Sequence, residues 1–373
     1  MKDTIKILCS GDFAPLLNSG SQNIDPFQDI QKLISNANAH ITNLECPITT
    51  LNQPIAKTGL VLKAIPENIT LLKEAGVSIA CMANNHIFDN GETGITDTMK
   101  ICNEHGINTL GIVNRTDNKP HWLITEIKGK KIGFLNYCEH EFSVREPGLI
   151  GACGYNSIDA FYDISKLKSS VDVLVVIYHG GNEYYALPNP ELKKTFHYLA
   201  DLGADAVIGH HTHVYSGYEI YNDKPLVYSL GNFFFPLENE PESWHLGLLC
   251  MLNISDKIQI DLYPILQCEE KMKVSLVHGE KLAQLKENID QLSRKIGNDD
   301  LLWKSWSEYS EKMRLGYLKQ FPCLTLPIRI LLKLGLPLSY IMPKKRLRLF
   351  TNLLNCQAHL EILKKALKEK GIQ

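Results

Sequence analysis

The sequence predicts a layered α/β fold with much parallel strand pairing, followed by a mainly helical C-terminal extension. Over the first 265 residues, short runs rich in Val, Ile and Leu alternate with helical patterns, as α/β layers require. From about residue 271 the pattern becomes helical and the charge changes sign. Residues 1–270 carry 19 basic and 32 acidic side chains, whereas residues 271–373 carry 20 basic and 9 acidic ones. We therefore expect two domains, 1–270 and 271–373.

Nine apolar runs are predicted to be strands, because most of them end at Gly, Asn, Asp or Pro. They are Ile5–Cys9, Ala39–Asn43, Val77–Ala83, Lys131–Cys138, Val171–Tyr178, Asp205–Ile208, Leu226–Leu230, Leu246–Asn253 and Gln259–Ile265. Helices are predicted to begin at Pro26, at Pro66 and at Pro190, the last running to Gly203, because proline is favoured in the first turn. No helical pattern separates the last three strands, which predicts an antiparallel addition to the sheet.

The C-terminal region is predicted to be helical and basic. Apolar residues spaced three and four apart indicate an amphipathic helix from Leu282 to Ile296, and a second helical pattern covers about 357–370. Between them, residues 321–342 are rich in Leu and Ile but contain three prolines, and a basic cluster follows at 344–348. This tail either contacts an anionic membrane surface or packs on the acidic body, and the sequence leaves both open.

Composition excludes several classes of protein. With 44% hydrophobic residues the chain can bury a sizeable core, and a net charge of −2 excludes a generally basic nucleic-acid binder. Ten scattered cysteines without a C-x-x-C pair are typical of a reducing compartment. The first residues lack the apolar stretch of a signal peptide, and no window has 18 uncharged apolar residues. We therefore expect a cytoplasmic protein, with a peripheral position at the inner membrane face left open by the basic tail.

Residues that can bind metals follow five of the predicted strands, at the edge where an α/β sheet presents its ligand site. Taken one at a time, each group could be a turn, a cap or an exposed loop. The three imidazoles of the last group favour a metal, because neutral His is the commonest metal ligand. The groups are Gly11-Asp12, Asn43-Leu44-Glu45, Asn84-Asn85-His86, His179-Gly180-Gly181-Asn182-Glu183 and His210-His211-Thr212-His213.

Together these residues match the needs of a centre with two divalent ions, which requires a bridging carboxylate, imidazoles and a neutral oxygen. Because the donors are nitrogen and oxygen without thiolate, we expect one or two ions of Mn, Fe or Zn. His86 is expected to be the general acid for the leaving group. The expected ligands are Asp12, Glu45, Asn85, His179, His211 and His213, and the candidates for substrate contact or ligand support are Asn84, His210, Glu183, Lys57, Lys63 and Asn232.

In order and spacing, the motifs resemble the CapA family of capsule and poly-γ-glutamate biosynthesis proteins, a branch of the calcineurin-like metallophosphoesterase fold. The resemblance covers about residues 5–235 and implies a four-layer α/β/β/α double sandwich, with the same ligands and His86 as proton donor. The sequence departs from the wider metallophosphoesterase pattern at two positions. Ala14 stands in place of the His of its Asp-x-His motif, and Glu45 stands in place of its bridging Asp. The matching segments are 11–14, 43–49, 83–91, 178–184, 203–214 and 228–235.

The function expected from this resemblance is metal-dependent hydrolysis in the synthesis or remodelling of a surface polymer, either a polysaccharide or poly-γ-glutamate. Hydroxide held by the metals would attack a phosphoester or an amide. The expected partner is an anionic polymer or a lipid-linked polymer intermediate. Two alternatives stay open because of the missing Asp-x-His ligand: a non-catalytic metal-binding subunit of a polymer synthesis complex, and a metal-dependent isomerase or epimerase.

Overall fold

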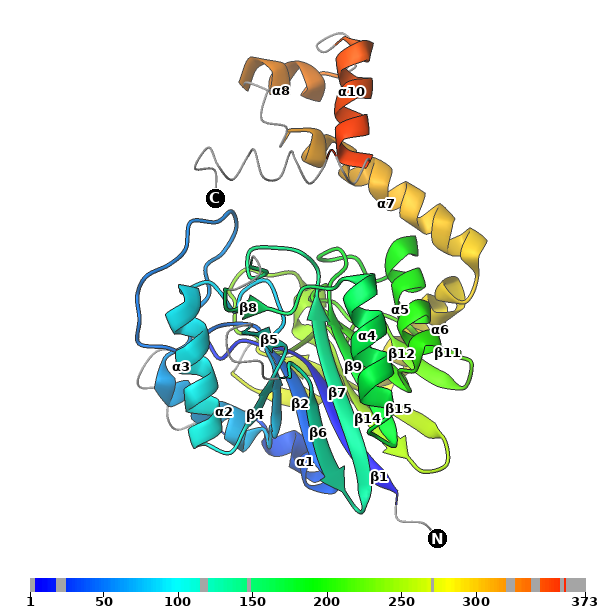
Figure 1. The fold of residues 1–373 in the computed structure, drawn as a ribbon. Helices are drawn as coiled ribbons and strands as arrows, with labels where there is room; N and C mark the ends of the chain where they lie inside the picture. The colour runs from blue at the N-terminus through cyan, green and yellow to red at the C-terminus, as the bar shows by residue number, and fades with distance from the viewer. Residues whose placement is uncertain are drawn as a thin grey trace. The chain divides into compact units, whose positions relative to one another are not determined.

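Two β-sheets stack against each other in residues 1–302, and helices cover the outer side of each sheet (Figure 1). The computed structural model describes residues 4–17, 25–114, 120–145, 149–269, 272–319, 326–336, 343–355 and 359. Helices α1 (Gln31–Asn36), α2 (Ile69–Glu74) and α3 (Gly91–Glu104) belong to one outer layer, and α4 (Ser157–Lys168) and α5 (Pro190–Leu202) to the other. The predicted α/β/β/α class is therefore confirmed.

The first sheet mixes parallel and antiparallel pairs around its first strand, which is parallel to two of its partners and antiparallel to the third. A further strand, β13 (Asn232–Phe234), pairs with that first strand beside the main path. The main path runs in the order β16 (Val274–Leu276), β15 (Ile258–Gln267), β14 (Leu246–Ile254), β1 (Ile5–Phe13), β2 (Ala39–Leu44), β3 (Ile79–Cys81) and β4 (Asn108–Leu110).

The second sheet has a parallel centre and an antiparallel strand at each edge. A separate two-stranded sheet joins β5 (Ile112–Val113) to β8 (Gly151–Ala152). The order of the second sheet is β11 (Tyr218–Tyr221), β12 (Lys224–Val227), β10 (Ala206–His210), β9 (Val173–His179), β7 (Lys130–Cys138) and β6 (Leu123–Ile127).

The predicted antiparallel addition is correct for two of its three strands. β14 and β15 pair antiparallel in the first sheet, but the Leu226–Leu230 run forms β12, which is parallel to β10 in the second sheet. The difference arises from a hairpin that periodicity did not detect. Asn222 and Asp223, both with positive φ, form its two-residue turn, so that β11 precedes β12 and β12 returns alongside β10.

Helix signals were most reliable where proline and glycine frame one helix. α5 begins at Pro190, is capped by the Asn189 side chain, which accepts from the Leu192 N–H, and ends at Gly203, whose φ is 131°. The predicted starts at Pro26 and Pro66 lead first into 3-10 turns, η1 (Gln28–Ile30) and η2 (Pro66–Asn68). A third turn, η3 (Glu242–His245), precedes β14.

The amphipathic helix predicted from Leu282 to Ile296 is α6 (Gly279–Ile296), and its apolar face joins the core of residues 1–302. Gly217 lies directly against it, since a Cβ there would be 2.5 Å from the Ser293 nitrogen. The domain boundary at 270/271 stays a prediction. By compactness, the chain divides after Leu302.

The second unit, 303–373, is helical where it is described, as predicted. It contains most of α7 (Asp299–Lys319) together with α8 (Leu326–Lys333) and α10 (Lys344–Asn355). The helical pattern predicted at 357–370 lies, apart from His359, outside the described residues. In the described part of the chain, no helix has the length and apolar content needed to cross a membrane.

Candidate metal centre

The ends of four strands bring the predicted ligands to one place between the sheets. Asp12 is paired in register with Asn43 of β2, and His210 at the end of β10 is paired with His179 at the end of β9. Gly11 is required beside Asp12, because a Cβ at this position would overlap the carbonyl oxygen of Gly231. This close approach of backbones explains why a glycine precedes the carboxylate in the first motif.

One group of potential ligands combines Asp12, Glu45 and His213, all buried, with ligand atoms within 4.8 Å of one another. His213 Nδ1 lies 3.3 Å from Asp12 Oδ2, and His213 Nε2 lies 3.7 Å from Glu45 Oε1. His213 Nδ1 is also 3.0 Å from Asn232 Oδ1. With Nδ1 held as a donor, Nε2 is the nitrogen that faces the shared carboxylate.

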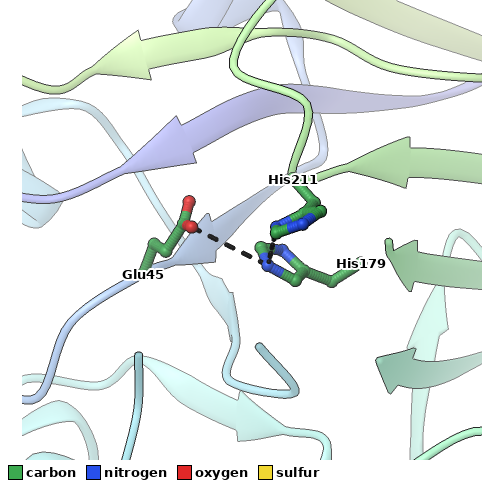
Figure 2. A group of neighbouring side chains, drawn as sticks. All are labelled: Glu45, His179 and His211. Atoms are coloured by element: carbon green, nitrogen blue, oxygen red, sulfur yellow. Dashed lines mark hydrogen bonds and ion pairs between the residues drawn. The ribbon is translucent and has the colours of Figure 1, made fainter. Parts of the chain in front are cut away.

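A second group combines Glu45, His179 and His211, again all buried (Figure 2). His179 Nε2 lies 3.0 Å from His211 Nδ1 and 3.7 Å from Glu45 Oε1, so both imidazoles and the carboxylate point toward one another. Asn85 Oδ1 lies 3.0 Å from the same His179 nitrogen. Glu45 therefore belongs to both groups, which is the position of a bridging ligand.

The unsatisfied oxygen of Glu45 tests whether these residues suit a cation. Glu45 is fully buried, and its Oε1 has no hydrogen-bond partner among the described residues. Burial, with the nearby charges of Asp12 and Glu183, raises the pKa of Glu45 well above its ordinary value. A divalent cation would supply the partner that this oxygen lacks and would hold the carboxylate ionised, so the donor set fits a metal.

Of the imidazoles around Glu45, His179 and His211 favour the neutral form that metal ligands need, whereas Asp12, acting against burial, raises the pKa of His213. Burial, followed by the neighbouring His211, lowers the pKa of His179 well below its ordinary value, and burial also lowers the pKa of His211. Burial opposes ionisation of Asp12 as well, but the nearby His210 and His213 rings hold the pKa of Asp12 well below its usual range. The group of His179 and His211 thus offers two neutral imidazoles, and the other group offers the ionised carboxylate of Asp12.

The loop that carries His211 and His213 has a strained backbone conformation. His211 and His213 have φ values of 93° and 58°, in the left-handed region that side chains other than glycine avoid. Such a conformation costs on the order of 1–3 kcal/mol per residue and persists where the surroundings impose it. His210 is the last residue of β10, and its Nδ1 lies 3.2 Å from Asp12 Oδ1 but without hydrogen-bond alignment.

His86, the predicted proton donor, lies beside the two groups of potential ligands and contacts Asp89, which is paired with Lys57. Its Nδ1 lies 2.7 Å from Asp89 Oδ2, and Lys57 Nζ lies 2.7 Å from the other oxygen of Asp89. The side chains of Lys57 and Asp89 are almost fully buried. Lys57, predicted as a possible substrate contact, therefore has its ammonium group bound to Asp89.

Two amides support the ligands. The Asn84 side chain holds the turn, because its Oδ1 accepts from the backbone of His86 and Ile87 while its Nδ2 donates to Asn43 Oδ1. Asn232 lies on β13 and positions the His213 ring through the 3.0 Å contact between its Oδ1 and Nδ1.

Asn43 is a residue that sequence reasoning missed, although it stands two residues before Glu45 in the same motif. Its Nδ2 lies 2.8 Å from Asp12 Oδ1, 3.3 Å from Glu45 Oε2 and 3.2 Å from His179 Nδ1. Because an amide nitrogen has two hydrogens, it cannot satisfy all three acceptors at once. Its position at the end of the predicted strand Ala39–Asn43 was the available signal.

A cavity of about 240 Å³ opens onto this centre. Of the residues predicted to contact substrate, Glu183 and Lys57 line it, whereas Lys63 lies elsewhere and donates to the Leu51 carbonyl. Sequence reasoning did not single out several of its other wall residues, although Tyr184 lies in the matching segment 178–184. They are Glu141, Phe142, Tyr184, Glu240 and Trp244.

A larger cavity, of about 880 Å³, contains neither group. On its wall His121 Nε2 lies 2.8 Å from Asp163 Oδ2, and Tyr137 donates to the same oxygen. Burial by itself would lower the pKa of His121, but the hydrogen bond to Asp163 raises it to about 10. We place the functional site in the smaller cavity, because that is where the buried donors converge.

Comparison with known proteins gives a family and several relatives. The family model described as bacterial capsule synthesis protein PGA_cap matches residues 7–237. The chain is 30% identical over 216 residues to the PGA biosynthesis protein CapA of Bacillus subtilis, a match covering 56% of each chain. It is 28% identical over 218 residues to the capsule biosynthesis protein CapA of Bacillus anthracis, covering 56% of this chain and 53% of that one. The chain thus spans about half the length of these relatives.

Among solved structures, a hypothetical protein from Thermus thermophilus aligns with a TM-score of 0.43 and 16% identity. The alignment covers 70% of this chain and 99% of that protein.

Proposed function

The chain belongs to the family of bacterial capsule synthesis proteins, and on that premise we propose that it is a metal-dependent hydrolase acting on a surface polymer. The resemblance to the CapA family seen in the sequence is confirmed by the family match and by the Bacillus relatives. Hydrolysis, the metal and the polymer are the parts that we propose.

The observation that carries the proposal is the buried Glu45 carboxylate shared by two groups of ligands. Two divalent ions, when bound there, would polarise the substrate and lower the pKa of a water molecule, the chemistry of two-metal hydrolases. The chain's own residues fix the geometry for this. Asn43 and Asn232 orient a carboxylate and an imidazole, and burial excludes bulk water from both groups.

His86 is the group suited to move the proton. Because Nδ1 is held by Asp89, Nε2 is the nitrogen left to exchange a proton, and within the described residues it has no protein partner. His86 lines the cavity next to Asn85, so a leaving group bound at the centre would meet this ring. Asp89 fixes the tautomer and the orientation of the ring, and Lys57 holds the other oxygen of Asp89.

The cavity wall indicates which polymer we propose. Glu141, Glu183 and Glu240 line it together with the rings of Tyr184 and Trp244, which stack 6.0 Å apart. Carboxylates accept hydrogen bonds from hydroxyl groups and repel a polyanion, and aromatic faces pack on apolar C–H surfaces. We therefore favour a phosphoester in a saccharide, such as a lipid-linked intermediate, over the amide of poly-γ-glutamate.

The test is hydrolysis of bis(p-nitrophenyl) phosphate by the full chain loaded with Mn²⁺. We expect turnover that is lost on chelation and restored by Mn²⁺. Replacement of His86 by Asn should lower kcat at least 100-fold while metal content, measured by elemental analysis, stays unchanged. His140→Asn is the matched control, because His140 is an exposed histidine outside both ligand groups.

Two outcomes would contradict the proposal. Protein that binds metal but hydrolyses neither phosphodiesters nor phosphomonoesters would favour the non-catalytic subunit. Deuterium uptake from solvent into an added sugar substrate, without hydrolysis, would favour the isomerase or epimerase. If the saccharide preference is correct, poly-γ-glutamate should inhibit turnover less than a neutral oligosaccharide phosphate does.

A further inference from the structure

The C-terminal part of the chain contains a long segment without acidic residues. Residues 312–360 include nine Lys and Arg and no Asp or Glu. An ordinary solvent-exposed protein surface shows no such bias, because it carries both positive and negative side chains. The bias therefore indicates a negatively charged partner.

The clearest part of this bias is the start of α10. Lys344, Lys345, Arg346 and Arg348 fall within its first five residues, with no acidic residue in the first turn. Cations at this end of a helix oppose the macrodipole, so they do not stabilise α10 itself. All four side chains are exposed, and none has an ion-pair partner within the described residues. Their charge is free to bind an anionic surface.

Large apolar side chains are exposed on the same helices. On and just beyond α8, Leu326, Ile330 and Leu334 recur every four residues, so they lie along one face. Leu326 is 71% exposed and Leu334 is 74% exposed. Leu349 of α10 is 60% exposed. A nucleic acid would neutralise the cations but leave these leucines in water, whereas a lipid surface accommodates both.

We propose that the second unit binds the surface of an anionic lipid bilayer through α8 and α10. The leucines would embed at the boundary between headgroups and acyl chains, and the cations of α10 would contact lipid phosphates. Binding is interfacial, because no helix in the described residues could cross the bilayer. The proposal stands apart from catalysis, since it uses none of the residues of the metal centre.

The experiment is co-sedimentation of the full chain with vesicles of phosphatidylcholine alone and with 30% phosphatidylglycerol. We expect binding to the anionic vesicles only, at least tenfold weaker in 500 mM than in 50 mM salt. Replacing the four cations of α10 by Gln should weaken binding at 50 mM salt about 100-fold or more, since each contributes about fivefold. The matched control replaces four exposed lysines of the first unit by Gln: Lys32, Lys73, Lys100 and Lys286.

The apolar contribution is tested separately, because it does not depend on salt. Leu326→Gln with Leu334→Gln should lower binding at least tenfold at both salt concentrations. Circular dichroism of every variant checks that helix content is retained. The proposal is wrong if wild-type protein stays in the supernatant with anionic vesicles at 50 mM salt, or if the α10 variant sediments like wild type. In the first case, a loss of thermal stability in the α10 variant would show that the tail pairs with the acidic body instead.

Discussion

Replacing Glu45 by Gln tests two effects of this carboxylate: it destabilises the metal-free protein, and as a shared ligand it strengthens metal binding. Without metal, Glu45 is buried, and its Oε1 has no partner among the described residues. Gln keeps an oxygen for Asn43 Nδ2, now 3.3 Å from Glu45 Oε2, and removes a negative charge close to Asp12. We therefore expect the metal-free variant to be more stable than metal-free wild type.

The size of both effects can be worked out from this geometry. An unsatisfied buried polar group costs about 1–3 kcal/mol, so the metal-free variant should gain about that much, or roughly 1.5–5 °C in Tm. With metal, wild type gains more stability than the variant. At a metal concentration 100 times Kd, wild type gains about 2.7 kcal/mol. If loss of the shared ligand weakens affinity 100-fold, the variant gains only about 0.4 kcal/mol at the same concentration.

Thermal melts in EDTA and in Mn²⁺ or Zn²⁺, followed by circular dichroism, measure both the stability difference without metal and the gain of each protein with metal. Glu141→Gln is the control, because Glu141 Oε1 lies 4.0 Å from His211 Nε2 and its side chain is 36% exposed. That variant should melt like wild type in EDTA. A Glu45→Gln protein that is less stable than wild type in EDTA, yet shifts equally with metal, would refute the assignment of Glu45 as a shared ligand.

Three further substitutions test the surroundings of the site. Lys57→Met should lower the free energy of unfolding in urea by about 3–5 kcal/mol at pH 7, because it leaves Asp89 buried without its cation, and a change below 1 kcal/mol would contradict the buried pair. His121→Asn should remove a pH dependence of the free energy of unfolding. Because the pKa of His121 is raised from 6.5 to about 10, its pairing with Asp163 stabilises the fold fully below pH 6.5. This stabilisation is lost as the pH rises through 10. Urea unfolding should show wild type losing about 3 kcal/mol over this window, discounted for partial exposure, and an equal loss in the variant would contradict the pairing. Gly217→Val should cost about 1–3 kcal/mol by pushing α6 away and should speed limited proteolysis after residue 279, whereas unchanged cleavage would show that α6 can adjust.

Sequence patterns located the strand ends but not the contacts between them. The apolar run Val77–Ala83 was predicted as one strand, yet β3 covers only Ile79–Cys81. The reason is tertiary, because the Ala83 N–H leaves the sheet edge to donate to Asn136 Oδ1, 53 residues away. Periodicity describes which side of a strand is buried and does not report where a distant amide ends it.

The same limit applies to the site. Its histidines and carboxylates were predicted from residue type and order, because few side chains can bind a metal and they occurred after several strands. The burial of Lys57 could not be predicted, since an isolated lysine in a glycine-containing loop is usually exposed. Its partner, Asp89, lies 32 residues further along the chain, and only the folded loops bring the two together.

The two departures from the Asp-x-His pattern act on the same side of the centre. Ala14 is fully buried in the hydrophobic cluster that contains Phe13, its N–H donates to the Phe234 carbonyl, and its methyl side chain offers no ligand atom. The Asp12 group therefore offers three potential protein ligands, whereas the His179 group also offers the oxygen of Asn85. Three protein ligands with open positions are still compatible with a catalytic site. Glu45 is the one potential ligand that belongs to both groups within the described residues, and so substitution of Glu45 tests the two-metal interpretation more directly than loss of any single histidine.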